Sequence, residues 1–158
     1  MAPDGSVWGT ELHSNRIFRF DPRTERFETH TLPTAHSGPR RADFDASGNF
    51  WIAEYAANKL ARFDPRTRRF TEYALPIPDA LPYIARVDCR SGMVWIGTGA
   101  ADAIVGFDPR TERFTVHRLP TRGALIRHMD IDLRTGDVWA AYGAAPGIPP
   151  RIARLRTR

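Results

Sequence analysis

The chain consists of short stretches in which aromatic and branched apolar residues alternate with polar ones. The clearest series covers residues 40–45 (RRADFD), 49–54 (NFWIAE), 59–64 (KLARFD) and 69–75 (RFTEYAL). Gly, Asn, Asp or Pro residues bound these stretches, as is typical of β-strands separated by tight turns. No segment shows the period of an amphipathic helix. The pattern therefore predicts four short antiparallel strands in this part of the chain.

The same series recurs along the chain. The octapeptide FDPRTERF occurs at residues 20–27 and 107–114, and FDPRTRRF occurs at residues 63–70. In the DPRT segment, Asp accepts local backbone hydrogen bonds and Pro presets φ for a type I turn. Tryptophan recurs every 43 or 44 residues, at Trp8, Trp51, Trp95 and Trp139. Four strands in a repeat of this length are typical of a β-propeller blade, and we interpret the tryptophans as packing between blades.

The repeats predict one all-β domain, a β-propeller of four-stranded antiparallel blades over residues 1–158. The expected units are a partial blade at residues 4–37, complete blades at 38–80 and 81–124, and a partial blade at 125–158. About three and a half blades form an incomplete ring, since closed propellers have typically four to eight. Open terminal blades would expose apolar faces and strand edges. We therefore expect further blades from a longer protein, or a second copy of the chain, to close the ring.

Composition limits the class of protein. Hydrophobic residues make up 42% of the chain and charged residues 26%, which is typical of a globular domain. No apolar run approaches the ~20 residues of a membrane helix, and residues 1–6 (MAPDGS) do not resemble a secretory leader. We expect a soluble protein without a membrane partner, cytoplasmic or, if the natural chain starts upstream, secreted or periplasmic. Cys89 is the sole cysteine, so no internal disulfide can form.

The net charge of +5 raises the question of an acidic partner. Of the 23 basic residues all but Lys59 are arginines, and many of these arginines lie in the repeated DPRT turns. They form neither a run nor a helical stripe, and no aromatic and basic recognition element accompanies them. We therefore predict that the protein does not bind nucleic acid.

The repeated units resemble a known family. Residues 7–33 (VWGTELHSNRIFRFDPRTERFETHTLP) and 50–76 (FWIAEYAANKLARFDPRTRRFTEYALP) are similar to blades of the streptogramin B lyases, also called virginiamycin B lyases. The resemblance implies a seven-bladed propeller with a magnesium ion at one mouth of its central channel. It also implies a carbon–oxygen lyase of antibiotic resistance, which opens a cyclic depsipeptide by elimination across an ester. A histidine would be the base, and the metal would support the developing negative charge.

Other residue types occupy most of the positions that this resemblance marks as catalytic. The glutamate that ends the second strand of a blade is present twice and replaced twice, as Glu11, Glu54, Thr98 and Tyr142. The histidine at the start of the first strand is replaced in three blades, by Arg40, Tyr83 and Arg127. His128 comes one residue late, where strand alternation predicts that it points to the other face. No blade carries the His and Glu pair, so the catalytic residues are unknown.

Strand order still predicts where a ligand would bind. In an antiparallel meander the start of the first strand and the end of the second lie at the same edge, and propellers bind ligands at a mouth of the channel. The expected ligand-binding face is therefore formed by Glu11, His13, Arg40, Glu54, Tyr83, Thr98, Arg127 and Tyr142. Its arginines suit carboxylate or phosphate, and its glutamates suit a hard cation. In an alternative interpretation, Arg40 and Glu54 pair with each other inside one blade.

Two functions remain open from the sequence. The first is a streptogramin-lyase-like enzyme that uses magnesium, as the resemblance implies. The second is a non-catalytic propeller, a binding or scaffold module for a small anionic or peptide ligand. The residues at the predicted mouth favour binding, whereas the resemblance favours the enzyme.

Overall fold

The computed structural model describes residues 2, 4–143 and 149–157. Within these residues the chain forms strands and no helix, and so it contains no helix long and apolar enough to cross a membrane. The predicted all-β class is confirmed. Residues 144–148 of the expected fourth unit lie outside the described residues.

The strands form four groups in chain order, which we name blades A to D. Blade A contains β1 (Val7–Glu11), β2 (Arg16–Asp21) and β3 (Arg26–Thr31). Blade B contains β4 (Pro39–Phe44), β5 (Phe50–Glu54), β6 (Lys59–Asp64) and β7 (Arg69–Ala74). Blade C contains β8 (Pro82–Val87), β9 (Val94–Thr98), β10 (Ala103–Asp108) and β11 (Arg113–Arg118). Blade D contains β12 (His128–Ile131), β13 (Val138–Tyr142) and β14 (Arg151–Leu155).

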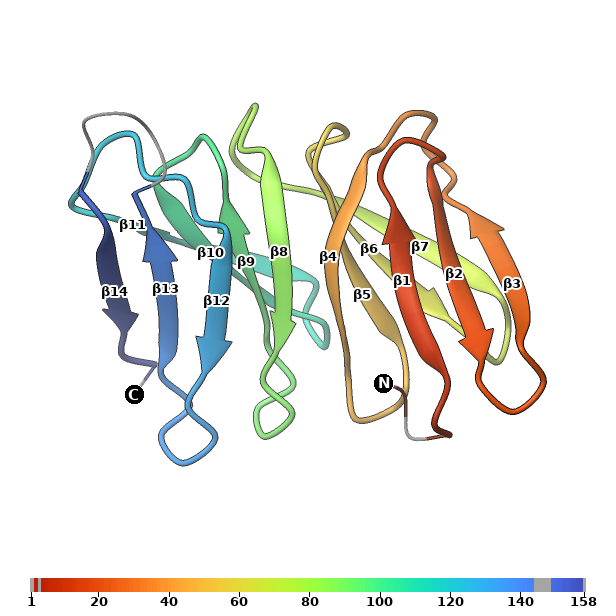
Figure 1. Ribbon diagram of the computed structural model, residues 1–158. Coiled ribbons are helices and arrows are strands. Elements are labelled where there is room, and N and C mark those ends of the chain that lie inside the picture. Colours follow the sequence, from red (N-terminus) through yellow and green to blue (C-terminus); the bar gives the residue numbers. More distant parts are fainter. Residues whose placement is uncertain (1, 3, 144–148, 158) are drawn as a thin grey trace.

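Each blade is an antiparallel meander, and the blades stand side by side in an arc (Figure 1). The first strands of blades B and C, β4 and β8, are the inner strands, and they meet in parallel at Arg41 and Ile84. The β12 strand of blade D lies on the other side of β8. Three inner strands therefore line the concave side of the arc.

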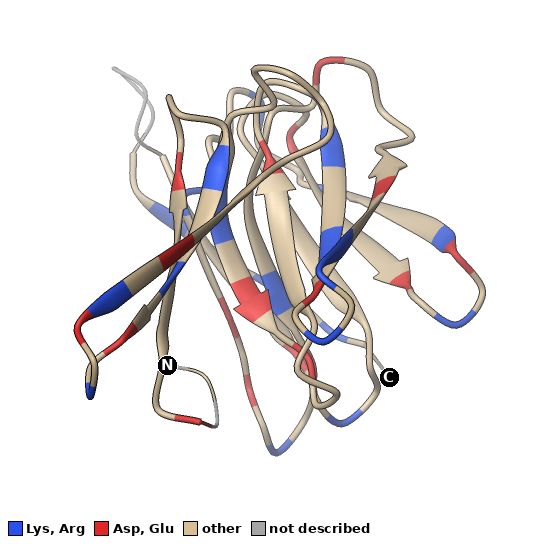
Figure 2. Ribbon diagram, turned by 90° about the vertical axis from the view of Figure 1, so that its right-hand side faces the viewer, with Lys and Arg blue, Asp and Glu red and all other residues tan. Residues whose placement is uncertain are grey.

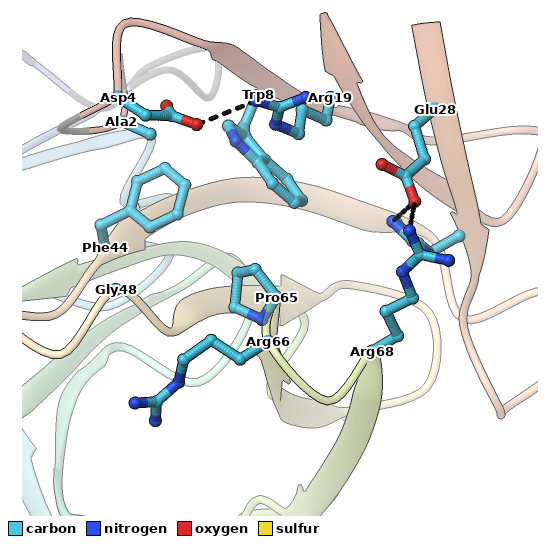
Figure 3. A pocket seen from close by; sticks show the side chains of 11 residues that line it. Ala2, Asp4, Trp8, Arg19, Glu28, Phe44, Gly48, Pro65, Arg66 and Arg68 are labelled. Carbon is cyan, nitrogen blue, oxygen red and sulfur yellow. Dashed lines mark hydrogen bonds and ion pairs between the residues drawn. The ribbon is translucent and has the colours of Figure 1, made fainter.

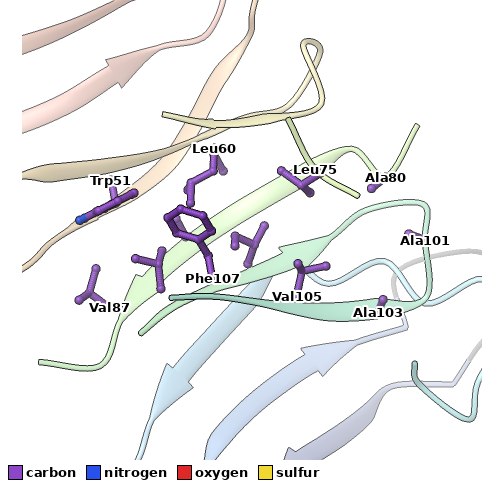
Figure 4. Close-up of a cluster of buried hydrophobic side chains, with 13 residues drawn as sticks. Trp51, Leu60, Leu75, Ala80, Val87, Ala101, Ala103, Val105 and Phe107 are labelled. Carbon is purple, nitrogen blue, oxygen red and sulfur yellow. The ribbon is translucent and has the colours of Figure 1, made fainter. Parts of the chain in front are cut away.

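Side chains on the two faces of a blade pack against different neighbours. In blade B, Trp51 packs toward blade C, where its ring centre lies 5.8 Å from that of Phe107 (Figure 4). Phe50, on the opposite face of the same strand, packs toward blade A, 5.7 Å from Trp8. Because alternate residues of a strand point to opposite faces, one strand supplies both interfaces. The predicted role of the repeated tryptophan in packing between blades holds for Trp8, Trp51 and Trp95, which contact the next blade.

The repeated turns form in the way that their sequence predicts. In each DPRT segment the carboxylate of the Asp accepts a hydrogen bond, 2.9 Å long, from the backbone N–H of the Arg two residues later; the three pairs are Asp21 and Arg23, Asp64 and Arg66, and Asp108 and Arg110. These turns lie at the lower edge of the arc in Figure 1. Charged residues are scattered over strands and turns and do not gather on one blade (Figure 2).

At the upper edge, one residue per blade fastens the connection to the next blade. Asn15, Asn58 and Asp102 have φ of 56°, 57° and 49°, a left-handed conformation that Asn and Asp tolerate better than other residues. Their side-chain oxygens accept the backbone N–H of Ser37, Ala80 and Ala124, at 2.8, 2.9 and 2.6 Å. Since each connection leads directly into the next inner strand, these bonds fix the segments that carry the candidate ligand face.

Candidate functional site

The predicted ligand face lies at the upper mouth of the arc in Figure 1. Its members end the strand before the upper hairpin, lie in that hairpin, or lie at the start of an inner strand: Glu11, His13, Arg40, Glu54, Tyr83, Thr98, Arg127 and Tyr142. The structure brings only part of this set into contact. Arg40 meets Tyr83, and the backbone of Arg127 meets Arg41. The other members lie apart in their own blades.

Arg40 is held between two aromatic rings. Its guanidinium carbon lies 4.1 Å from the centre of the Tyr83 ring and 4.7 Å from that of Tyr55. Such cation–π contacts hold a positive charge without neutralising it. The Nε atom of Arg40 is buried and has no hydrogen-bond partner among the described residues. A shift in the β4–β5 register between Pro39 and Ala42 turns Arg40 out of regular alternation.

Arg41 reaches across the mouth to blade D. Its Nη1 donates to the backbone carbonyl of Arg127 at 2.8 Å and lies 3.4 Å from Nδ1 of His128. The side chains of Arg41, Arg127 and His128 are all exposed. Four basic residues, Arg40 included, therefore gather along the upper ends of the inner strands.

A line of paired charges lies below this basic group. Arg86 of β8 has Nη2 2.7 Å from the carboxylate of Asp130 on β12 and Nη1 3.5 Å from that of Asp43 on β4. Asp43, Arg86 and Asp130 occupy equivalent positions in three successive repeats. Two carboxylates share one guanidinium, so the middle of the wall keeps one net negative charge, and the unpaired positive charge lies at the mouth.

A hollow of about 470 Å³ extends from Arg40 and Arg41 at the mouth to the ion pair of Asp43 and Arg86. It runs along β4 beside the edge of β1, and its polar wall includes Thr10, Arg40, Arg41, Asp43, Arg86 and His128. The hydroxyl of Thr10 donates to the backbone carbonyl of Arg40, which joins blade A to this wall. The volume lies in the range of small-molecule sites.

Glu54 is enclosed instead of facing the mouth. It is 0% exposed, and neither carboxyl oxygen has a hydrogen-bond partner among the described residues. Lys59 lies opposite it in the β5–β6 register, but the Lys59 ammonium binds Glu72 at 2.8 Å and the hydroxyl of Thr34 at 2.7 Å. Burial, followed by the negative charge of Glu72, raises the pKa of Glu54 to about 8. Glu54 is therefore a neutral acid near pH 7, and the expectation that it could pair with Arg40 is wrong.

The remaining candidates have structural surroundings. Thr98 is fully buried, and its hydroxyl donates to the carbonyl of Ala103 at 2.7 Å, which closes the β9–β10 hairpin. The hydroxyl of Tyr142 lies 3.2 Å from that of Thr121, in the connection between blades C and D. Glu11 is partly exposed and His13 is exposed.

The residues at this mouth do not fit a magnesium ion. Magnesium prefers several ionised carboxylate or other oxygen ligands in octahedral geometry. Among the described residues of the mouth, Glu54 has the one fully buried carboxyl group, and Thr98 has used its hydroxyl in its own hairpin. No three His, Cys, Asp or Glu side chains converge in the part of the chain that the structure describes.

Sequence reasoning missed Tyr55, Arg41 and His128 as members of this site. Strand alternation predicted only that His128 points to the other face of its strand; its ring lies beside Arg41 in the hollow along β4. A signal was present in the repeat, because Arg41, Ile84 and His128 occupy equivalent positions on the three inner strands. Tyr55 carries no such signal, since it follows the end of β5 in an irregular turn.

The family model of the virginiamycin B lyase family matches residues 1–149. No curated protein sequence matches the chain. Among solved structures, a virginiamycin B lyase from Staphylococcus aureus is 20% identical with a TM-score of 0.81, and a streptogramin B lyase is 23% identical with a TM-score of 0.83. Each comparison covers 99% of this chain and 53% of the other.

A protein other than these lyases has a similar fold. Hydrazine synthase from Kuenenia stuttgartiensis has a TM-score of 0.85 at 12% identity, over 99% of this chain and 44% of that protein. Identities this low show the fold alone, and the chain spans about half the length of the lyases that it matches. The predicted propeller fold is confirmed, and the match over residues 1–149 shows that the chain belongs to the virginiamycin B lyase family.

Proposed function

We propose that this chain forms the wall of a propeller channel that binds a small anionic ligand, such as a carboxylate, at the mouth defined by Arg40 and Arg41. The observation that carries the proposal is the Arg40 guanidinium, which two tyrosine rings hold in place without neutralising its charge. A donor held in advance loses little conformational freedom when a ligand arrives. Charge-assisted hydrogen bonds from arginine to carboxylate are among the strongest that proteins make.

The surroundings of Arg40 support an anion over a cation. Arg41, Arg127 and His128 add basic groups at the same mouth, while Glu54 is neutral near pH 7. Asp43 and Asp130 share the guanidinium of Arg86, and their one net negative charge lies below the mouth. The hollow between β1 and β4 has room for a ligand body below the anionic group.

Calorimetric titration tests this proposal with benzoate and inorganic phosphate as probes, in a buffer of low ionic strength. We expect Arg40→Gln and Arg41→Gln each to raise Kd about tenfold or more, because a hydrogen bond to a charged group contributes about 1.5–3 kcal/mol. Arg23→Gln is the matched control, since Arg23 is an exposed arginine in a turn at the opposite edge. Equal loss in all three variants, or no binding by the unmodified protein, would contradict the proposal.

Family membership supports a second candidate, a carbon–oxygen lyase that opens a cyclic depsipeptide. In such an elimination a base removes a proton from carbon, a carbon–carbon double bond forms, and the ester carboxylate leaves. Glu54 is enclosed and does not face the mouth, and the positions that correspond to the catalytic histidine hold Arg40, Tyr83 and Arg127. The binding role is therefore favoured over the enzyme for these residues.

A further inference from the structure

Trp95 lacks the indole hydrogen bond that Trp8 and Trp51, its equivalents in the repeat, make. The indole N–H of Trp51 donates to the carboxylate of Asp45 at 2.9 Å, and that of Trp8 donates to the hydroxyl of Ser6 at 2.9 Å. Trp95 is only 5% exposed, yet its Nε1 is buried without a partner among the described residues. A buried donor left unpaired costs about 1–3 kcal/mol, so the unpaired N–H needs an explanation.

The turn before Trp95 explains the loss. The segment from Asp88 to Trp95 is one residue longer than the segment from Asp45 to Trp51. Asp88 uses its carboxylate within the turn, where it accepts the hydroxyl of Ser91 at 2.6 Å and the backbone N–H of Arg90 at 3.0 Å. Asp45 makes similar bonds in its own turn, to the backbone N–H groups of Ser47 and Asn49, and still accepts the indole N–H of Trp51. The extra residue in blade C, and not the turn bonds of Asp88, therefore accounts for the loss.

The Trp95 ring also forms the wall of a hollow of about 460 Å³ between blades C and D. Met93, Trp95, His117 and Leu155 supply much of its apolar wall. The His117 ring centre lies 5.7 Å from that of Trp95, and burial lowers the pKa of His117, which favours the neutral imidazole. The unpaired indole N–H and the hollow therefore belong to the same place in the fold.

A similar hollow occurs at a second interface between blades. The equivalent interface, or seam, between blades A and B contains a hollow of about 370 Å³ beside Trp8 and Phe44 (Figure 3), although blade B has all four strands. His30 also lines it. Tyrosine replaces histidine at the seam between blades B and C. There the Tyr73 ring packs 4.6 Å from Phe107, and its hydroxyl reaches Glu112 at 3.4 Å. A tyrosine side chain is larger than a histidine side chain, so we infer that tyrosine at position 117 would occupy the space beside Trp95.

We propose that the hollow between blades C and D is a binding site for a small, neutral, planar aromatic molecule that carries a hydrogen-bond acceptor such as a carbonyl group. The aromatic body would lie against Trp95 and His117, and the acceptor would take the unpaired indole N–H. The buried carboxylate of Asp88 in the wall disfavours an anionic ligand. Of the two guanidinium groups in the wall, that of Arg90 already donates to the carbonyls of Leu133 and Arg134, and that of Arg156 is exposed to solvent. The site is separate from the channel mouth, and it does not depend on the proposed function.

Acetophenone and ethylbenzene are matched probes, because they share a skeleton and only the first carries an acceptor. Nitrogen-15 NMR of the full chain would follow the indole N–H signals, with the signal of Trp95 identified from Trp95→Phe. We expect acetophenone to move the Trp95 signal and to bind about three- to tenfold more tightly than ethylbenzene, as one neutral hydrogen bond predicts. The indole signals of Trp8 and Trp51 should stay in place.

A second variant separates binding from folding. His117→Tyr should fill the hollow as Tyr73 fills the B–C seam, and so abolish acetophenone binding while leaving the Trp95 signal in the spectrum. His36→Tyr, in an exposed connection, should bind as the unmodified protein does. A Trp95 signal that acetophenone does not move, as expected if an ordered water already satisfies the indole, would overturn the proposal. Equal affinity for the two probes, or binding retained in His117→Tyr, would overturn it as well.

Discussion

The guanidinium carbon of Arg40 lies 4.1 Å from the centre of the Tyr83 ring, across the boundary between blades B and C. The contact places an unneutralised charge where the two inner strands enter the channel wall. It also links two positions that are equivalent in the repeat, one occupied by a cation and the next by an aromatic ring. Blade packing and ligand affinity should therefore depend on the same contact.

Removing the Tyr83 ring should loosen Arg40. We expect Tyr83→Leu to lower the free energy of unfolding by about 1 kcal/mol, in the range of cation–π contacts, and to weaken benzoate binding. Tyr83→Phe keeps the ring and should preserve both properties. Urea denaturation and calorimetric titration of the same samples measure the two effects. Equal behaviour of the Leu and Phe variants would show that the ring does not position Arg40.

Glu54 should make the stability of the protein depend on pH. Its pKa is about 8 in the folded protein and 4.5 in its ordinary state, so the folded protein binds a proton that the unfolded chain has lost between these values. The free energy of unfolding should then fall as pH rises from about 4.5 to about 8, by an amount on the order of a few kcal/mol, and level off above. Glu54→Gln should flatten this fall. Urea denaturation between pH 5 and 9 measures it.

Glu11→Gln is the control for this experiment, because Glu11 ends β1 as Glu54 ends β5 but is partly exposed. It should keep the pH dependence of the unmodified protein. If Glu54→Gln retains the full fall in stability, another group carries it and the assignment of a neutral buried acid is wrong.

The seam between blades A and B should accept a larger ring. The His30 ring centre lies 4.5 Å from that of Phe63, as Tyr73 lies 4.6 Å from Phe107 one seam later. We expect His30→Tyr to stabilise the protein by roughly 0.5–1 kcal/mol through additional buried apolar area. Thermal unfolding by calorimetry measures this gain. A lower midpoint would mean that the hollow beside Trp8 cannot accommodate the tyrosine ring.

The outer faces of blades A and D should associate. Val7 and Phe27, exposed on blade A, correspond in the repeat to Phe50 and Phe70, which pack toward the neighbouring blade. On blade D, Trp139 and Ile152 are 39% and 72% exposed. Since other copies of these faces pack against each other within the chain, we expect two copies to associate head to tail, and light scattering to show species larger than a monomer.

Phe27→Glu places a charge on that face and should shift the protein toward the monomer. Val116→Glu is the control, since Val116 is similarly apolar but lies on β11, away from the blade A face. A sharp-melting monomer in the unmodified protein would contradict the association.

The chain should not linearise a streptogramin B antibiotic, because Arg40, Tyr83 and Arg127 occupy the positions of the lyase histidine. The protein would be incubated with magnesium and the antibiotic, and the mixture separated by chromatography before mass spectrometry, since elimination conserves mass. Appearance of a linear product would restore the enzyme as the function of these residues.

The repeat predicted the fold because each strand depends on local patterning that recurs almost unchanged. The DPRT turns and the seam tryptophans are read directly from residue type and spacing. From the sequence, the candidate site could be located only to one edge of the blades. Which side chains meet there depends on the register shift beside Arg40. It also depends on the ion pair of Lys59 with Glu72, which leaves Glu54 without this partner. The seam hollows depend on one ring, His30 or His117 against Tyr73, and the sequence suggested no role for these histidines.

Diffraction from crystals grown with 4-bromobenzoate tests the central claim most directly, because the anomalous signal of bromine places the ligand. The account predicts a bromine site in the hollow between β1 and β4, with the carboxylate on the guanidinium groups of Arg40 and Arg41, and loss of that site in Arg40→Gln crystals. Bromine only at other places on the protein, or an equally strong site at this mouth in Arg40→Gln, would contradict it.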